Sequence, residues 1–333
     1  MTGRPVLVTG GAGFVGRHVT AELRAAGHEV VVADKRDARG VDVVGDLCDA
    51  DVRATAMNGA MNGAMNGAVN GAVQGDGEGV GAVVHLAAET SVLGSMERPA
   101  LVHRTNVEMT AALLELCRTR GVDTFVAAST NAVVGTVSGT ITEDLPLAPL
   151  TPYGATKAAA EMVMSGYAGA YGLRAVALRF SNVYGPGMQH KDSLVPRLFR
   201  AAVEGRGIQV YGDGHQRRDL VSVREVARAA VQALEGWPSG PVIIGSGRSY
   251  EVLEIVAAAR EVTGAEIPVE HVDPKPGEMP AVVVDTSRAR SYGWTPAVQL
   301  AEGMRDAWSD FRQHLSQDLP QDHPQDHPRG LGR

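Results

Sequence analysis

Runs of mostly apolar residues recur along the first half of the chain. They fall at positions 6–8, 30–33, 41–44, 80–86, 124–128 and 175–180. Strands that are covered on both faces read as continuous apolar runs, whereas strands with one solvated face alternate between apolar and polar residues. The pattern therefore predicts a set of buried strands.

Helical patterns lie between these runs. One extends from Phe14 to about Ala26 and stops at Gly27, a second covers about 106–120, and a third starts after Pro152. Strands that alternate with helices are joined by right-handed crossovers, which produces a parallel, doubly wound sheet. We therefore expect an α/β fold of the Rossmann type.

The chain has 333 residues, which exceeds the ~100–150 residues of a typical single domain. We expect a Rossmann domain over 1–180 and a smaller α/β domain, mainly for substrate binding, over 181–313 and interleaved with the first. The segment 314–333 repeats Gln-Asp-His-Pro and is predicted to be a disordered tail. His323 and His327 lie between prolines with no third ligand nearby, so no metal site is expected there.

A four-residue repeat interrupts this organisation at 57–76. Met-Asn-Gly-Ala occupies 57–60, 61–64 and 65–68, and looser copies that begin with valine follow. Each glycine in a helix costs about 1 kcal/mol relative to alanine, so a stable free helix is not expected. Because surface insertions cost little closure entropy, we interpret the repeat as a tolerated insertion between the third and fourth strands. A lid or an oligomer contact is the alternative.

Composition and charge exclude several classes of protein. Lys and Arg number 31 against 38 Asp and Glu, for a net charge of −7, without a basic run, which disfavours nucleic-acid or membrane-surface partners. No apolar stretch approaches the ~20 residues that span a bilayer, and the start of the chain lacks the layout of a signal peptide. The two cysteines, Cys48 and Cys117, suit a reducing compartment. We expect a cytoplasmic protein without a bound metal.

A glycine-rich turn joins the first predicted strand to the first helix. Gly10, Gly13 and Gly16 allow a tight turn, close approach of the backbone to a pyrophosphate, and close packing of helix on strand. The helix N-terminus then presents N–H groups and its positive dipole end to the phosphates. Asp34 ends the second strand eighteen residues after Gly16, where its carboxylate can bind the ribose hydroxyls. The pattern predicts a dinucleotide site.

Residues around Asp34 refine the choice of dinucleotide. Its carboxylate repels a 2′-phosphate, which favours NAD over NADP. Lys35 and Arg36 follow directly, and they keep NADP as an alternative. Asp46 and Leu47 follow the third strand, where Asp46 is placed to meet the adenine amino group. A helix N-cap is the alternative role for Asp46.

Four motifs, in this order, resemble those of the extended short-chain dehydrogenases/reductases. They are Gly-Gly-Ala-Gly-Phe-Val-Gly at 10–16, His-Leu-Ala-Ala at 85–88, Ser-Thr at 129–130 and Tyr-Gly-Ala-Thr-Lys at 153–157. Within that superfamily the chain is similar to the nucleotide-sugar epimerases and dehydratases over about 5–312, apart from the repeat. The resemblance implies NAD on the sheet and a nucleotide diphosphate sugar beneath the smaller domain. Besides the residues named above, it assigns cofactor contacts to Phe14, Val15, Leu86, Ala87, Ala88, Tyr153 and Lys157.

Tyr153 and Lys157 lie four residues apart and therefore share one face of the predicted helix. A phenol with a pKa of about 10 is a poor base at neutral pH, but a nearby ammonium group favours the phenolate. The pair can then accept the proton of a sugar hydroxyl, with Thr130 hydrogen-bonded to the same oxygen, while hydride leaves the carbon for the nicotinamide. We expect these three residues to be catalytic. An exposed helix pair is the alternative for the tyrosine and lysine.

The resemblance also implies contacts with the substrate. The candidates are Thr90, Ser91, Asn182, Leu194, Val210, Tyr211 and Arg218. Asn182 and Arg218 resemble the family's diphosphate contacts, because a guanidinium offers a charged fork to phosphate oxygens; a surface salt bridge is the alternative for Arg218. Leu194 and Tyr211 would border the base. Thr90 and Ser91 are placed to reach the sugar, with a helix cap as their alternative role.

The two positions after Thr130 separate the possible reactions. In the 4,6-dehydratases an Asp-Glu pair follows the threonine, and in the UDP-glucuronate decarboxylases a glutamate commonly lies at the second position. This chain has Asn131 and Ala132 instead. Because alanine cannot transfer a proton, the full dehydratase reaction is disfavoured. The remaining residues can still support oxidation at C4 followed by return of hydride to the rotated 4-keto sugar. This favours a 4-epimerase acting on a UDP- or dTDP-sugar.

Alternatives to the epimerase stay open. A 4-keto uronic acid loses carbon dioxide with little acid–base help, so a UDP-glucuronate decarboxylase that forms UDP-xylose or UDP-4-keto-xylose is the main one, ahead of a 4,6-dehydratase or a 4-ketoreductase. Val134 replaces the tyrosine of the family's Val-Tyr-Gly motif, which alters the expected sugar pocket. A dinucleotide-sensing protein would keep the glycine turn but has no use for the catalytic residues. The helices near 106–120 and 154–171 form the family's dimer interface, so we expect a homodimer.

Overall fold

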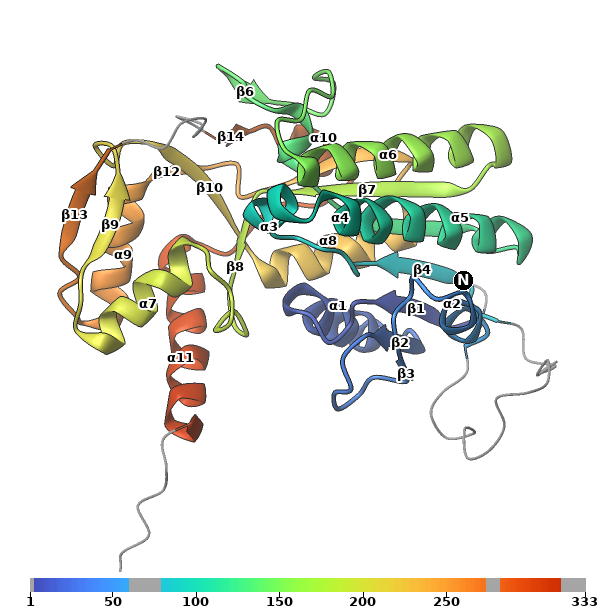
Figure 1. Ribbon diagram of the computed structural model, residues 1–333, viewed down its shortest axis with the longest axis horizontal. Coiled ribbons are helices and arrows are strands. Elements are labelled where there is room, and N and C mark those ends of the chain that lie inside the picture. Colours follow the sequence, from blue (N-terminus) through green and yellow to red (C-terminus); the bar gives the residue numbers. More distant parts are fainter. Residues whose placement is uncertain (1–2, 60–78, 274–281, 319–333) are drawn as a thin grey trace, which may run out of the picture.

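A seven-stranded parallel sheet forms the centre of the computed structural model, which describes residues 3–59, 79–273 and 282–318 (Figure 1). The order of its strands is β11-β7-β5-β4-β1-β2-β3. They are β1 (Val6–Thr9), β2 (Val30–Asp34), β3 (Val43–Val44), β4 (Ala82–His85), β5 (Thr124–Thr130), β7 (Arg174–Phe180) and β11 (Gly240–Ile244). The prediction of a doubly wound α/β fold of the Rossmann type is confirmed.

Helices cover both faces of this sheet (Figure 1). They are α1 (Phe14–Ala25) and α8 (Val223–Gly236) on one face and α2 (Ala50–Met57), α5 (Met109–Thr119) and α6 (Pro152–Tyr171) on the other. Val19 and Val226 belong to the core on the first face, and Leu113 to the core on the second. Every residue of β1 and β2 is buried, as continuous apolar strands require.

The strand order determines where a ligand can bind. From β1 the chain adds β2 and β3 on one side and then β4, β5 and β7 on the other, so the direction of winding reverses between β1 and β4. Thr9, the last residue of β1, pairs with His85, the last residue of β4. In open α/β sheets ligands bind beyond the carboxyl ends of the strands at such a switch point.

A second group of elements packs beside the carboxyl edge of the sheet (Figure 1). It contains α7 (Leu194–Glu204), α9 (Val252–Thr263), α11 (Leu300–Asp318), the sheet β8 (Asn182–Tyr184), β10 (Arg217–Ser222) and β12 (Ser249–Glu251), and the pair β9 (Ile208–Tyr211) and β13 (Val269–Val272). Phe199, Ile255 and Met304 lie in its core. Smaller elements are α3 (Val92–Glu97), α4 (Pro99–His103), the π-helix η1 (Arg104–Glu108), the 3₁₀-helix η2 (Asn131–Val134), α10 (Ser287–Ser291) and the pair β6 (Thr140–Ile141) and β14 (Val283–Val284).

The chain passes between the two groups more than once. After β8, α7, β9 and β10 it returns to cover the central sheet with α8 and to add β11 beside β7. It then builds α9 and α11 of the second group. The central sheet is therefore completed only by residues 240–244.

Three expectations about element boundaries need correction. The third strand covers only Val43–Val44. The helix expected at 106–120 is part of a longer helical stretch that begins at Pro99, because a proline is tolerated in the first turn of a helix. The tail was expected to start at 314, but α11 continues to Asp318. The remainder of the tail lies outside the described residues.

The beginning of the repeat also differs from expectation. Met57 is the last residue of α2, has no exposed surface, and packs in the core beneath the sheet. Its carbonyl oxygen accepts the N–H of Val80 at 3.1 Å, which joins the end of α2 to the segment just before β4. Met57 is thus a core residue and not part of an insertion. Residues 60–78 lie outside the described residues.

The described part of the chain has neither a membrane-spanning helix nor a cluster of metal-ligating side chains. None of its helices is long and apolar enough to cross a membrane. The same residues contain no group of three or more His, Cys, Asp or Glu side chains that could hold a metal ion. Both cysteines are free thiols.

Candidate active site

Helix α6 carries two of the expected catalytic residues. The hydroxyl of Thr151 caps the helix by accepting the N–H of Gly154 at 3.2 Å, and Pro152 occupies the first turn. The helix ends where Gly172 adopts a left-handed conformation with φ of 71°. These signals place Tyr153 in the first turn, with Lys157 one turn further on.

Gly154 brings the start of α6 close to the end of β5. A Cβ atom at this position would lie 2.8 Å from the carbonyl oxygen of Ala132, so any other residue would push the helix away. With glycine there, the side chains of Tyr153 and Thr130 are hydrogen-bonded to each other. The ammonium of Lys157 donates to the carbonyl oxygen of Ala128, which lies two residues before Thr130 on β5, at 2.9 Å. The structure thus brings Thr130, Tyr153 and Lys157 together.

Burial shifts the titration of both α6 residues. It raises the pKa of Tyr153, and the hydrogen bond with Thr130 opposes this effect. It lowers the pKa of Lys157 to about 8, against the opposing effect of the Glu161 carboxylate. We expected the lysine to stabilise the phenolate, but burial is the dominant influence on Tyr153 in this geometry.

A buried ion pair supports this face of α6. Glu161, one turn beyond Lys157, accepts from the guanidinium of Arg179 at 2.7 Å, and both side chains are less than a tenth exposed. Glu161 also accepts the hydroxyl of Ser129, the residue before Thr130. The pair therefore joins α6 to β5 and β7. The sequence analysis missed it, although glutamate eight positions after the tyrosine lies on the same helix face.

The glycine turn fits a dinucleotide. Gly10 has φ of 68°, and a Cβ atom there would lie 2.7 Å from the backbone nitrogen of Ala87, so the turns after β1 and β4 touch. The N-cap residue of α1 is Gly13, and no side chain in the described chain caps this helix. Its first N–H groups are accordingly available to phosphate oxygens. Phe14 is buried, and Gly16 packs against the turn at Gly10.

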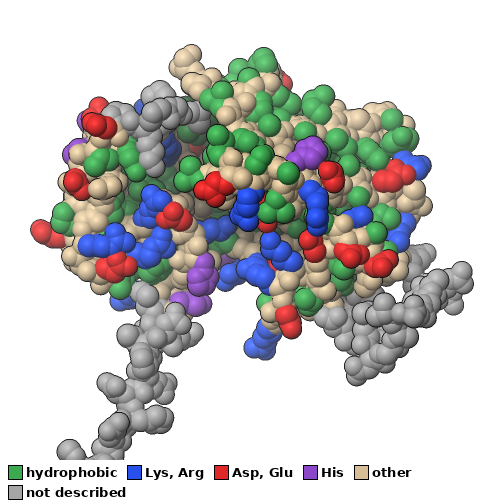
Figure 2. Space-filling view, in the orientation of Figure 1, with side chains coloured by type: hydrophobic (Ala, Val, Ile, Leu, Met, Phe, Trp, Pro, Cys, Tyr) green, Lys and Arg blue, Asp and Glu red, His purple; other side chains and the backbone are tan. Residues whose placement is uncertain are grey.

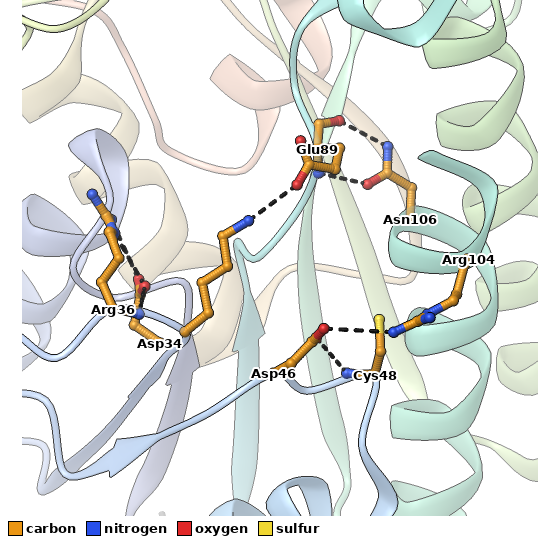
Figure 3. Close-up of polar contacts among 8 residues, drawn as sticks. Asp34, Arg36, Asp46, Cys48, Glu89, Arg104 and Asn106 are labelled. Carbon is orange, nitrogen blue, oxygen red and sulfur yellow. Dashed lines mark hydrogen bonds and ion pairs between the residues drawn. The ribbon is translucent and has the colours of Figure 1, made fainter. Parts of the chain in front are cut away.

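Asp34 lies at the end of β2 beside the glycine turn. Its carboxylate accepts the N–H of Ala12 at 3.0 Å and the N–H of Arg36 at 2.9 Å. The Arg36 guanidinium folds back onto it at 3.2 Å, while Lys35 reaches across to Glu89 at 3.1 Å (Figure 3). Both cations that kept NADP as an alternative are therefore held by carboxylates.

The alternative role suggested for Asp46 is wrong. The N-cap of α2 is Asp49, whose side chain accepts the N–H of Asp51. Asp46 accepts the N–H of Cys48 at 2.8 Å and lies 3.6 Å from the guanidinium of Arg104 (Figure 3). The side chain of Leu47 packs in the core, so only its backbone could meet a cofactor.

Burial lowers the pKa of His85 to about 3, so its ring is neutral. A chain of hydrogen bonds determines which ring nitrogen carries the proton. The hydroxyl of Thr110 donates to the carbonyl oxygen of Asn106 at 2.7 Å, so it can only accept from the Nε2 of His85, 3.1 Å away. The proton of the neutral ring is therefore on Nε2, and Nδ1 accepts from the hydroxyl of Thr9 at 2.7 Å. The oxygen of Thr9 is left to accept the N–H groups of residues 86 and 87, both at 3.2 Å.

Asn106 continues this network toward the catalytic helix. Its side chain accepts the N–H of Glu89 at 2.9 Å and donates to the carbonyl oxygen of the same residue at 3.0 Å (Figure 3). It also donates to the hydroxyl of Thr156, which bonds the carbonyl oxygen of Tyr153. Asn106 sits on the π-helix η1, a type of turn frequent at functional sites. The sequence analysis missed it because a π-turn has no signature in apolar periodicity.

The candidate substrate residues of the second group meet at one cavity. A pocket of about 960 Å³ opens beyond the carboxyl ends of β7 and β8. Five of the expected residues line it: Asn182, Leu194, Val210, Tyr211 and Arg218. Arg197, Arg200 and Arg206 line it as well, and sequence reasoning did not single them out. On the face seen in Figure 2, Lys and Arg side chains gather near the middle, between the two groups of elements.

Buried Asp219 holds the wall of this pocket in place. Its carboxylate accepts the hydroxyl of Ser181 at 2.6 Å and the backbone and hydroxyl of Ser246, and its carbonyl oxygen accepts from Asn182 at 2.9 Å. Neighbouring Arg218 is half-buried and donates to the carbonyl oxygen of Arg217.

Thr90 and Ser91 lie elsewhere, on the turn before α3. The side chain of Ser91 caps that helix by accepting the N–H of Gly94 at 2.9 Å, which is the alternative stated for it. Both residues are exposed and do not line the pocket. The cap is next to Ser95, whose hydroxyl accepts the N–H of Tyr153, so the turn supports the start of α6.

Comparison with known proteins places the chain in a family. The sequence profile described as the NAD dependent epimerase/dehydratase family matches residues 6–245. The chain belongs to this family, and the expectation of NAD as its cofactor is confirmed.

Individual relatives divide between two reactions. A dTDP-glucose 4,6-dehydratase of Streptomyces niveus is 33% identical over 323 residues, covering 90% of each chain. A UDP-glucose 4-epimerase of Thermus thermophilus, solved with NAD, is 33% identical with a TM-score of 0.81 and covers 92% of this chain and 99% of its own. A UDP-glucose 4-epimerase of Thermotoga maritima, solved with UDP-glucose, is 29% identical with a TM-score of 0.82. The match covers 93% of this chain and 99% of the Thermotoga chain.

Proposed function

We propose that this protein is an NAD-dependent nucleotide-sugar 4-epimerase acting on a UDP- or dTDP-linked hexose. The observation that carries the proposal is the absence of a carboxylate at Asn131 and Ala132, beside a complete set of Thr130, Tyr153 and Lys157. Glu161 cannot replace those carboxylates, because Arg179 and Ser129 hold it on the far side of Lys157. The site therefore suits oxidation and reduction at one carbon.

In this proposal Tyr153 moves the proton of the C4 hydroxyl. Thr130, hydrogen-bonded to the tyrosine, contacts the same sugar oxygen, and the ammonium of Lys157 stabilises negative charge on the phenol oxygen. NAD supplies the acceptor and donor for hydride when it is bound. Asn182 and Arg218 hold the diphosphate, and Leu194, Val210 and Tyr211 border the base in the pocket of about 960 Å³. Thr90 and Ser91 support the start of α6 indirectly, through the turn before α3.

The cofactor side of the proposal rests on the first group of elements. The N–H groups at Phe14 and Val15 bind the pyrophosphate at the N-terminus of α1, and Asp34 binds the adenosine ribose. Lys35 and the segment at Asp46 and Leu47 border the adenosine. Leu86, Ala87 and Ala88, held by the hydroxyl of Thr9, form the opposite wall.

The experiment that tests the function follows products and cofactor together. Purified protein with NAD is mixed with UDP-glucose, UDP-galactose, dTDP-glucose or UDP-glucuronate, and the products are separated by chromatography. We expect interconversion of the C4 epimers without net NADH, because an epimerase regenerates NAD in each cycle. Persistent NADH absorbance with release of a keto sugar or carbon dioxide would reject the epimerase and favour the decarboxylase. Binding without turnover of any sugar would favour a sensor.

The lowered pKa of Lys157 predicts the pH dependence of turnover. Burial disfavours the ammonium, so Lys157 is charged below about pH 8 and neutral above it. In the proposed mechanism that charge stabilises the phenolate form of Tyr153, so we expect kcat to fall as the pH rises through about 8. Lys157→Arg keeps the charge at every accessible pH and should remove this fall. A wild-type profile that keeps rising to high pH would contradict the assignment.

We also propose a homodimer formed by α5 and α6. These helices lie side by side on one face of the sheet, and Met162 and Tyr171 of α6 are 61% and 58% exposed (Figure 1). Met162→Arg should shift the protein from dimer to monomer in light scattering, since it places a charge in the interface. Val203→Arg on α7, where the valine is 47% exposed, is the matched control and should leave the dimer intact. A wild-type monomer would exclude the interface.

A further inference from the structure

The segment between β8 and α7, residues 185–193, lies between two helices that belong to different groups of elements (Figure 1). We call it the linking segment. On one side is α1, where Nε2 of His18 donates to the carbonyl oxygen of Pro186 at 2.9 Å. Gly187 has a φ of 87°, and a Cβ atom there would lie 2.8 Å from a guanidinium nitrogen of Arg17. The backbone of the linking segment therefore packs directly against α1.

On the other side, one carboxylate of α11 binds the linking segment at two points. Oδ2 of Asp310 accepts the backbone N–H of Gly187 at 2.7 Å and the side-chain N–H of Gln189 at 2.5 Å. Met188, between these two residues, is buried in the core of the second group. Hydrogen bonds to an ionised acceptor are roughly twice as strong as those between neutral groups. Asp310, whose side chain is 26% exposed, is thus the polar anchor of this segment.

The far end of the linking segment forms part of the pocket wall. Ser193 ends the segment, Leu194 begins α7, and both line the pocket of about 960 Å³. Arg200 of α7, another lining residue, donates to the carbonyl oxygens of Gln189 and Lys191 at 3.0 and 3.1 Å. A displacement at the Asp310 end would therefore be passed to the wall through both the backbone and Arg200.

We infer that Asp310 is a positioning residue for the nucleotide-sugar pocket, although it does not line that pocket. Its carboxylate holds the linking segment between α11 and α1 and so fixes the pocket wall at Ser193 and Leu194. The inference rests on the proposed function, which places the nucleoside of the substrate in this pocket. Loss of the carboxylate should weaken binding of the nucleotide and leave the chemical step at Tyr153 intact.

Binding measurements test this without requiring turnover. Calorimetric titrations of the NAD-loaded protein with UDP and with dTDP compare wild type with Asp310→Ala. We expect the nucleotide that binds wild type to bind the variant about 5- to 50-fold more weakly, because two hydrogen bonds to a charged acceptor no longer order the wall. Affinity for NAD should be unchanged. KM for the nucleotide sugar should rise by a similar factor while kcat stays within about twofold, a split that a general loss of stability would not produce.

Proteolysis gives a second readout of the same segment. Lys191 is exposed, and a protease specific for lysine needs the chain around its cleavage site to open locally. Asp310→Ala should be cut after Lys191 several-fold faster than wild type when no nucleotide is present. Asp310→Asn keeps one acceptor oxygen and should fall between the two proteins in both measurements. That variant also decides the matter if Asp310→Ala does not fold.

A matched control lies one turn earlier on the same helix. Asp306 pairs with Arg224 of α8 at 3.0 Å instead of with the linking segment. Asp306→Ala should leave the affinity for the nucleotide and the cleavage after Lys191 unchanged. The inference is wrong if the Asp310 variants bind the nucleotide as tightly as wild type, or if Asp306→Ala loses the same affinity, while the proposed function stands. Wild-type protein that binds UDP or dTDP but epimerises no sugar would reject the function alone, and failure to bind either nucleotide would overturn both.

Discussion

Replacing Tyr153 with phenylalanine is expected to reduce turnover by roughly 10²–10⁴-fold or more, the contribution typical of a positioned acid–base group. The change removes one oxygen, and Gly154, Thr151 and Pro152 still position the helix. Affinity for NAD and for the nucleotide sugar should therefore be nearly unchanged. Single-turnover measurement of C4 oxidation, combined with titration of both ligands, checks the expectation.

Two variants show whether the loss is specific. Tyr167→Phe removes a phenol oxygen from the same helix, where it contacts Glu115 far from Thr130, and should leave turnover unchanged. Thr130→Val should reduce the rate less than Tyr153→Phe, since the tyrosine can still accept the proton. Substantial epimerisation by the Tyr153 variant would mean that another group takes the C4 proton.

Replacing Glu161 with leucine is expected to destabilise the fold by about 3–5 kcal/mol, the usual cost of leaving one partner of a buried ion pair without its counter-charge. The guanidinium of Arg179 is 2% exposed and bonds Glu161 through two of its nitrogens, at 3.0 and 2.7 Å. The hydroxyl of Ser129 also loses its acceptor. Denaturant unfolding followed by circular dichroism measures the change.

The double variant Glu161→Leu, Arg179→Leu distinguishes the cost of one unpaired buried charge from the cost of losing the whole ion pair. Replacing both members of a buried ion pair by apolar groups is often neutral or stabilising, so most of the lost stability should return. The exposed pair of Arg118 and Glu115 is the control, and Arg118→Ala should have little measurable effect. If the single Glu161 variant is as stable as wild type, the ion pair does not hold α6 against the sheet.

Signals confined to a few neighbouring residues were predicted well. The strands at 6–9 and 30–34 are continuous valine-rich runs, and the turn at Gly10 is visible from spacing alone. Tyr153 and Lys157 could be placed on one helix face because Pro152 marks the first turn and Gly172 the end. In each case the determining interactions lie within about one helical turn or one strand.

Features that depend on distant pairing were not predicted. Glu161 and Arg179 come from different elements, and the local sequence around each residue does not indicate that they form an ion pair. Met57 was assigned to the repeat because it begins the first Met-Asn-Gly-Ala unit, yet tertiary packing uses it as the end of α2. The composition predicts a tail from 314, whereas α11, which is anchored in the core by Met304, Ala307 and Phe311, continues to Asp318. The π-turn that positions Asn106 inserts a residue into a helix, which shifts the apolar stripe instead of creating one.

The late arrival of β11 has a consequence for how the protein is made. During synthesis, β7 emerges with one edge bare, and its neighbour at 240–244 follows only after the intervening elements of the second group. The helix α8, which covers one face of the same sheet, is also still missing at that stage. A bare edge and an uncovered apolar face are sites of aggregation, so the nascent first 180 residues need protection until translation passes Ile244. A fragment truncated at residue 180 should accordingly be recovered as insoluble aggregate, and adding residues up to the end of β11 is the least extension that completes the sheet.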